Sequence, residues 1–186
     1  MKEVIDTLFD EYFKSSYTIN DIIYWPGRIT LEQYIKQDEI IKERRPMSWC
    51  YGSLGILRSI YLASGYMSYK DIKSFAVNEL TKIAKLKMED YLLNMPNICH
   101  GFAGTVAIMS EMFLDTGNDI FVDVAKNQML DCIEYIINTD FKHTDPNREK
   151  RVYLYNYLEG YSGMLQVLLS LIGCDSNIHK KRILVV

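Results

Sequence analysis

The pattern Gly-x-x-Gly occurs three times in this sequence, and it constrains the fold more than any other feature. The copies are Gly52–Gly55, Gly101–Gly104 and Gly160–Gly163, and each opens a segment that is apolar nearly all round. Glycines at the start of a helix allow one backbone to approach another closely. The repetition predicts stacked helical hairpins, each with an apolar inner helix and an amphipathic outer helix. The alternative is an ordinary bundle in which these glycines serve only packing and capping.

The remaining segments also follow the 3.6-residue period of helices. A short capped helix is expected to begin at Thr30, because Gln33 follows it at the spacing of a capping box. No segment shows the alternation typical of strands, so we expect an all-α fold and a single domain over residues 1–186. The pattern predicts longer helices over residues 4–13, 52–64 (ended by Gly65), 68–91, 102–115, 119–138 and 161–172.

Composition excludes several classes of protein. The 21 basic and 24 acidic residues give a net charge of −3, which disfavours a nucleic-acid binder. No apolar run is long enough to span a bilayer. Glu3 and Asp6 lie where a signal peptide would be apolar, so we expect a cytoplasmic protein. In that compartment the 4 cysteines are expected to be free or metal-bound rather than paired in disulfides.

Metal-ligating side chains stand directly before two of the glycine motifs. Cys50 precedes the first motif, and Cys99 with His100 precedes the second. Two thiolates and one imidazole are the ligands of a zinc site whose fourth position is open, as in catalytic sites. A helix N-terminus also favours a thiolate over a thiol. The alternative is that each cysteine is a small buried hydrophobe, because the spacing is not that of a zinc finger.

The other candidate ligands have simpler interpretations. Cys132 is expected to pack in the core, and Cys174 is expected to be inert. His143 and His179 lie in polar segments, where a solvated histidine is the default. The tail 182–186 is expected to pack down on the rest of the chain.

At this point the motifs carry a resemblance to a known family. They resemble the three motifs of the lanthionine synthetase C-like family, which includes lantibiotic cyclases of the nisin and epidermin type. Trp25-Pro26-Gly27-Arg28 resembles a loop of the same cyclases, so the resemblance runs from about Tyr24 to the C-terminus. The matching motifs read Ser48-Trp49-Cys50-Tyr51-Gly52-x-x-Gly55, Cys99-His100-Gly101-x-x-Gly104 and Leu158-Glu159-Gly160-x-x-Gly163.

The resemblance implies an α/α toroid with Zn²⁺ held by Cys50, Cys99 and His100. It implies that a peptide cysteine, activated by the metal, adds to dehydroalanine or dehydrobutyrine and forms a lanthionine or methyllanthionine ring. The implied partners are a dehydrated lantibiotic precursor peptide and the dehydratase and transporter of a modification complex. Such a complex would bring the protein to the membrane periphery.

The resemblance also implies two catalytic residues. Tyr51 matches a position near the metal, although an aromatic residue at a helix start often only packs. An arginine ahead of the Trp-Cys pair is expected to stabilise the developing enolate, and Arg45 is the candidate, with Arg44 beside it. Both arginines are equally well explained as solvated loop charges.

The sequence also departs from the family pattern. Full-length members carry their proposed acid/base histidine in an N-terminal half, but no histidine here precedes the zinc motifs. The general acid is then absent or supplied by water. We therefore expect a C-terminal portion of a cyclase, roughly half a toroid, which would self-associate through its open apolar edge.

Three hypotheses follow for the function. The chain is a zinc-dependent cyclase or its catalytic fragment, an inactive remnant that still binds zinc or precursor peptide, or an unrelated helical scaffold.

Overall fold

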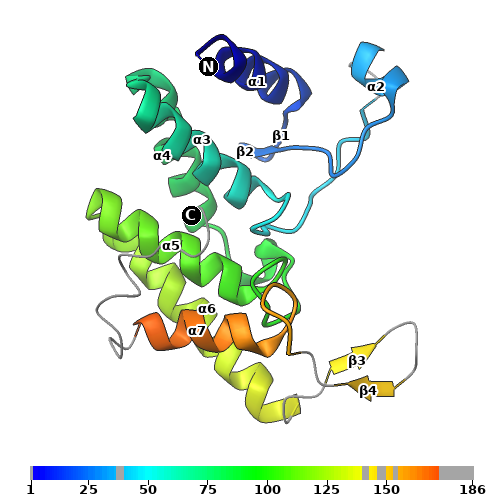
Figure 1. The fold of residues 1–186 in the computed structure, drawn as a ribbon, viewed down its shortest axis with the longest axis vertical. Helices are drawn as coiled ribbons and strands as arrows, with labels where there is room; N and C mark the ends of the chain where they lie inside the picture. The colour runs from blue at the N-terminus through cyan, green and yellow to red at the C-terminus, as the bar shows by residue number, and fades with distance from the viewer. Residues whose placement is uncertain (1, 37–39, 140–142, 146–149, 153–154, 172–186) are drawn as a thin grey trace. The chain divides into compact units, whose positions relative to one another are not determined.

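The computed structural model describes residues 2–36, 40–139, 143–145, 150–152 and 155–171, and helices dominate them (Figure 1). The expected all-α class is therefore confirmed. Backbone contacts divide the chain into two compact units, Met1–Leu92 and Leu93–Val186. Cys174, His179 and the tail 182–186 lie outside the described residues.

The first unit is built around a helical hairpin of α3 and α4, which pack along each other (Figure 1). Helix α3 buries residues on most of its circumference, including Leu54 and Leu57, whose side chains have no exposed surface. Helix α4 buries one face, as the amphipathic pattern predicts, with Lys70 exposed and Lys73 and Lys82 half-buried. The unit consists of α1 (Lys2–Ser15), β1 (Tyr17–Ile19), β2 (Ile22–Tyr24), α2 (Leu31–Lys36), α3 (Ser53–Met67), α4 (Lys70–Ala84) and the 3₁₀ helix η1 (Met88–Tyr91).

Two helix ends differ from the sequence-based expectation. Helix α3 does not stop at Gly65 but continues to Met67, and Ser68 adopts the left-handed conformation with φ 60°. The N–H of Ser68 donates to the carbonyl of Gly65, so the last turn is closed by a residue other than glycine. Helix α4 ends at Ala84, well before Tyr91, and the following residues form η1 instead.

A two-stranded antiparallel hairpin of β1 and β2 was not expected from the sequence. Tyr17 pairs with Tyr24, and the turn between the strands is made by Asn20 and Asp21. These two residues have φ values of 50° and 64°, the left-handed conformation that short hairpin turns require and that asparagine and aspartate tolerate. Strands of three residues are too short to show a period, which is why the alternation pattern missed them.

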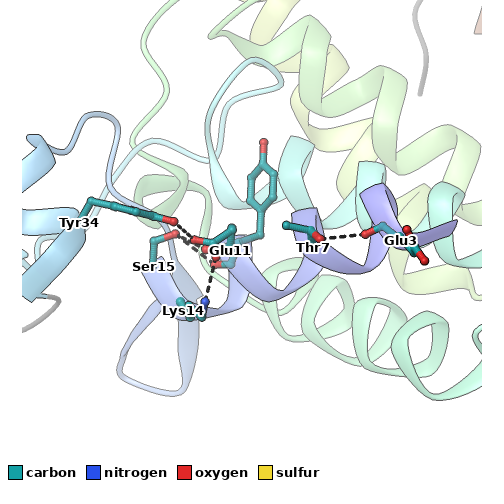
Figure 2. Close-up of polar contacts among 7 residues, drawn as sticks. Glu3, Thr7, Glu11, Lys14, Ser15 and Tyr34 are labelled. Carbon is teal, nitrogen blue, oxygen red and sulfur yellow. Dashed lines mark hydrogen bonds and ion pairs between the residues drawn. The ribbon is translucent and has the colours of Figure 1, made fainter. Parts of the chain in front are cut away.

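The polar face of α1 is occupied by its own hydrogen bonds and by α2 (Figure 2). Thr7 Oγ1 donates to the carbonyl of Glu3 at 2.8 Å, and Lys14 Nζ donates to the Glu11 carboxylate at 2.8 Å. The hydroxyl of Tyr34 from α2 donates to the other oxygen of Glu11. Helix α2 itself begins with the expected capping box, because Thr30 Oγ1 and Gln33 Oε1 accept each other's backbone N–H.

Aromatic contacts hold the apolar face of α1 to the rest of the first unit. The rings of Phe9 and Tyr69 meet edge to face at 6.3 Å, and those of Phe13 and Phe75 at 5.4 Å. The indole N–H of the buried Trp25 donates to the carbonyl of Tyr12 at 2.8 Å. The Trp-Pro-Gly-Arg loop is thereby anchored to the C-terminal end of α1.

The second unit repeats the hairpin plan. Helices α5 (Phe102–Thr116) and α6 (Asp119–Thr139) pack together, and α7 (Tyr161–Leu171) packs against α5 (Figure 1). Gly117, at φ 68°, ends α5 in the left-handed conformation and donates its N–H to the carbonyl of Phe113 at 2.7 Å. A second short hairpin, β3 (His143–Asp145) and β4 (Lys150–Val152), follows α6.

In the second unit the expected apolar helix and the expected amphipathic helix are both found. In α5 the side chains of Val106, Ile108, Met109 and Met112 have no exposed surface. Helix α6 buries Phe121 and Cys132 but exposes Leu130 at 60%. Within the described ranges, none of the helices combines the length and the apolar character that crossing a membrane would require.

Candidate metal centre

The glycine motifs are required by close backbone contact. A Cβ on Gly52 would lie 2.4 Å from the carbonyl oxygen of Pro46, and one on Gly101 would lie 2.2 Å from that of Met95. The same clash would occur at Gly55 against Trp49 and at Gly163 against Tyr157, at 1.8 and 2.0 Å. In all four cases the carbonyl belongs to the residue six positions earlier, so each loop folds back under the helix that follows it. This confirms the close approach predicted from the sequence.

The first N–H groups of α5 donate to carbonyls of the loop that folds back under the helix. The N–H of Phe102 donates to the carbonyl of Met95 at 2.8 Å, and that of Ala103 to the carbonyl of Pro96 at 3.3 Å. These two donors are therefore bound to loop carbonyls and are not available to a neighbouring thiolate. In the first unit the N–H of Gly55 is used in the same way, by the carbonyl of Ser48 at 3.3 Å.

Cys50 lies in the turn before α3 and is half-buried. Its Sγ lies 3.7 Å from Oγ of Ser48, a side chain that is 1% exposed. A serine hydroxyl can accept from a thiol or donate to a thiolate, so Ser48 suits either form of the sulfur. Ser48 belongs to the first motif, but its role could not be predicted from the sequence, since only the folded turn brings the hydroxyl to the sulfur.

A cavity of about 250 Å³ opens beside Cys50 within the first unit. One wall is the apolar face of α1, and the other is the side of α3 that begins at Gly55. Among its lining side chains, Ser59 donates its hydroxyl hydrogen to the carbonyl of Gly55 at 3.0 Å. The lining residues are Ile5, Leu8, Phe9, Tyr12, Trp49, Cys50, Gly55, Ile56, Ser59, Ile60 and Ala63.

Cys99 and His100 occupy the corresponding turn before α5 in the second unit. Both are half-buried. The N–H of Cys99 donates to the carbonyl of Leu158 at 2.9 Å, and a Cβ on Gly163 would touch Ile98 Cδ1 at 2.7 Å. The second and third motifs are thus packed against each other, and the third motif supports the turn that carries the two ligands.

A buried asparagine holds His100 at two points. The backbone N–H of His100 donates to Oδ1 of Asn97 at 3.0 Å, and Nδ2 of Asn97 lies 3.4 Å from Nε2 of the His100 ring. Asn97 is 2% exposed. Asn97 is not among the residues predicted from the sequence, although a short polar side chain three positions before a ligand in a turn is a usable signal.

Cys132 differs from the other described cysteines. It has no exposed surface, and its Sγ lies 3.8 Å from the carbonyl oxygen of Pro96. Burial raises the pKa of the Cys132 thiol to about 12, because a thiolate there would lose its hydration. A thiol that stays protonated cannot serve as a metal ligand, so this environment agrees with the expected packing role.

The two expected catalytic residues have different surroundings. Tyr51 is 54% exposed beside Cys50. Arg45 donates from Nη1 to Oε1 of Glu43 at 2.7 Å, and its guanidinium lies so close to Gly27 that a Cβ there would be 2.3 Å from Nη2. Arg45 lines a separate cavity of about 150 Å³ that also includes Arg28, whereas Cys50 lines the cavity along α1. The catalytic roles of both residues stay predictions.

Arg44 forms an ion pair within the first unit. Its Nη2 donates to the carboxylate of Asp90 at 2.7 Å, which ties the segment before the Trp-Cys pair to η1. The same hydrogen bond, with a second one to Tyr24, raises the pKa of the Arg44 guanidinium.

The donor atoms themselves fit a metal of borderline softness. Cys50 of the first unit offers one sulfur, and Cys99 and His100 of the second unit offer one sulfur and one imidazole nitrogen. Each is half-buried, neither sealed in the core nor fully in solvent. Sulfur and imidazole ligands in this ratio suit zinc, with one coordination position left for a substrate.

The described residues form helical hairpins, and glycine turns before two of the helices present two cysteines and a histidine. The family model of lanthionine synthetase C-like proteins matches residues 1–181, and this chain belongs to that family.

A solved structure, nisin cyclase, has the same fold over the matched part, with a TM-score of 0.68 at 20% sequence identity. The match covers 93% of this chain and 40% of nisin cyclase, so the chain spans less than half the length of that protein. The comparison with curated proteins found no match.

Proposed function

We propose that this chain forms lanthionine-type thioether rings in a dehydrated precursor peptide, with Zn²⁺ held by Cys50, Cys99 and His100. The observation that carries the proposal is the equivalence of two glycine turns, one presenting Cys50 and the other Cys99 and His100, in a chain of this family. The likeness to nisin cyclase agrees with a peptide substrate of the lantibiotic type.

The reaction needs an activated thiol and a protonated product. The chemistry that zinc supplies at such a site is to lower the pKa of a coordinated thiol. The peptide sulfur then bonds to the β-carbon of dehydroalanine or dehydrobutyrine, and the electron pair of the C=C bond moves to the α-carbon and its carbonyl as an enolate. A proton from water completes the α-carbon, and the thiol proton leaves to solvent.

The residues of this chain take separate roles in that scheme. Ser48 holds the Cys50 sulfur and Asn97 holds His100, as their hydrogen bonds indicate. Arg45 is the candidate for stabilising the enolate, and Tyr51 is the candidate for contacting the substrate beside the metal.

The cavity beside Cys50 suits the apolar part of such a peptide. At about 250 Å³ it is smaller than a typical small-molecule pocket of roughly 300–1,000 Å³. It has the size for one or two residues next to the reacting cysteine. Its walls carry no charged side chain, which agrees with an uncharged dehydrated residue rather than an acidic or basic one.

The wider setting follows from the same proposal. The chain would act on its precursor peptide in the cytoplasm, together with a dehydratase and a transporter at the membrane periphery. Self-association through the apolar edge of the helical array is part of this proposal and would be seen by light scattering.

Zinc content tests the proposal first. Protein purified without added metal should carry about one zinc per chain, and Cys50→Ala, Cys99→Ala and His100→Ala should each lose it, because each removes one ligand. Cys132→Ala is the matched control and should keep the metal. Zinc that persists in the three ligand variants would refute the site.

Ring formation separates the enzyme from an inactive zinc-binding relative. Wild-type protein incubated with a dehydrated precursor peptide should abolish thiol alkylation of the peptide, and Cys99→Ala should not. If the wild type binds zinc and the peptide thiols stay fully alkylatable, the second candidate holds, a zinc- or peptide-binding module without catalysis.

A further inference from the structure

We propose that Asn97 is a positioning residue that selects the tautomer of His100, placing the ring hydrogen on Nδ1 and leaving Nε2 without a hydrogen. The inference rests on the proposed function for its meaning, because the selected nitrogen is the one offered to the metal. Its evidence comes from the second unit alone.

The orientation of the Asn97 amide is set by the backbone. Its Oδ1 accepts the N–H of His100 at 3.0 Å, and only an oxygen can take that place, since the amide nitrogen would oppose one donor with another. The side chain is 2% exposed, so it cannot turn outward to water without opening the turn. The amide NH₂ therefore points to the His100 ring.

Nε2 of the His100 ring must then accept a hydrogen bond from the Asn97 amide. Nδ2 of Asn97 lies 3.4 Å from Nε2 of His100, and an amide nitrogen can only donate. A hydrogen on Nε2 would face the NH₂ hydrogens, so the neutral ring carries its hydrogen on Nδ1.

The contact is long for a hydrogen bond, and this matters for binding. A hydrogen bond of 3.4 Å is weaker than the usual one near 2.9 Å, so a metal that takes the Nε2 electron pair displaces little. The tautomer, however, is already the one that coordination through Nε2 requires. In known metal sites the partner usually accepts the N–H of the ring nitrogen away from the metal, whereas Asn97 selects the tautomer from the Nε2 side.

The substitution Asn97→Asp tests the idea with almost no change in shape. The carboxylate still accepts the backbone N–H of His100, so the turn keeps its first hydrogen bond. Its second oxygen replaces the NH₂ group, turning a donor into an acceptor at the same place. The hydrogen of the neutral ring should therefore move from Nδ1 to Nε2.

The tautomer can be read directly in metal-free protein by long-range ¹H–¹⁵N NMR of the histidine rings, in buffer where the rings are neutral. The chain has 3 histidines, so His100 is assigned by comparison with His100→Ala. The wild type should show Nδ1–H, and Asn97→Asp should show Nε2–H. Asn118→Asp, the same exchange at an exposed helix start, should leave the wild-type tautomer unchanged.

Titration with zinc then shows which nitrogen binds. The Nε2 resonance should shift in the wild type while Nδ1 keeps its hydrogen. A wild type with Nε2–H, an unchanged tautomer in Asn97→Asp, or a zinc-induced shift at Nδ1 would each overturn the inference. Failure to bind zinc would overturn the proposed function, and the metal-free tautomer would still decide the role of Asn97.

Discussion

The Cα of Gly101 rests against the carbonyl of Met95, so closely that a Cβ would lie 2.2 Å from its oxygen. This contact closes the turn that carries Cys99 and His100, because the same carbonyl accepts the N–H of Phe102. The glycine is therefore part of the framework of the candidate metal centre.

Gly101→Ala should destabilise the protein by about 1–3 kcal/mol, the usual cost of forcing an extra carbon into a packed site. Gly65→Ala is the matched control. The nearest atom to a Cβ there is the mobile Nζ of Lys73, at 3.8 Å within α3, so the added methyl group should be neutral or stabilising by up to about 1 kcal/mol. Urea denaturation of both variants measures the difference, and equal effects would contradict the close contact.

Burial of Cys132 predicts a difference in thiol reactivity. The pKa of its thiol is raised to about 12, and the side chain has no exposed surface. In metal-free native protein at neutral pH, iodoacetamide should modify Cys50 and Cys99 first and leave Cys132 unmodified until unfolding. Peptide mapping by mass spectrometry identifies the modified residues, and rapid labelling of Cys132 would contradict its place in the core.

The buried phenol of Tyr91 should make the protein less stable at high pH. Its side chain has no exposed surface and donates to the carbonyl of Ile83 at 3.0 Å, and burial raises the pKa of its phenol well above the usual value. The folded state therefore binds the phenolic proton more tightly than the unfolded state. The buried phenol therefore stabilises the fold fully below about pH 10. Above about pH 10 this contribution declines with rising pH, by up to about 1.4 kcal/mol per pH unit.

The variant Tyr91→Phe isolates this effect. It should cost about 1 kcal/mol at neutral pH for the lost hydrogen bond, and it should show a shallower decline above pH of about 10 than the wild type. The free energy of unfolding at several alkaline pH values gives both slopes. Identical slopes would show that the phenol is not the titrating group.

Comparing Arg45→Ala with Glu43→Ala separates a catalytic role of Arg45 from its ion pair with Glu43. If Arg45 stabilises the enolate, Arg45→Ala should lower kcat about 10²-fold with zinc content unchanged. Glu43→Ala removes the partner of the 2.7 Å ion pair and should leave kcat close to wild type. Equal loss of kcat in the two variants would favour a purely structural pair, which is the alternative interpretation of this arginine.

The cavity beside Cys50 can be filled from α3. Ala63→Phe places a ring in the cavity of about 250 Å³ and should weaken binding of the dehydrated peptide about tenfold or more, with zinc content unchanged. Leu114→Phe, on the exposed side of α5, is the control and should bind as the wild type does. Unchanged peptide affinity in Ala63→Phe would exclude this cavity as the binding place.

Local sequence patterns determined most of the helices and the glycine turns. Apolar periodicity located α1, α5, α6 and α7, and the exchange of side-chain and backbone bonds between Thr30 and Gln33 was predicted because a capping box is complete within four residues. The choice of Cys50, Cys99 and His100 as candidate ligands also needed only their positions before the Gly-x-x-Gly motifs.

Only the tertiary structure decided the surroundings of those residues. The N–H of Cys99 donates to the carbonyl of Leu158, and the indole N–H of Trp25 donates to the carbonyl of Tyr12. The guanidinium of Arg44 donates to the carboxylate of Asp90. In each case the partner is distant in sequence. Arg45 and Cys50 lie five residues apart, yet they line different cavities of the first unit. Periodicity describes which face of a helix is apolar, but hydrogen-bond partners, and with them the orientation of a histidine ring, depend on which chain segments fold back against one another.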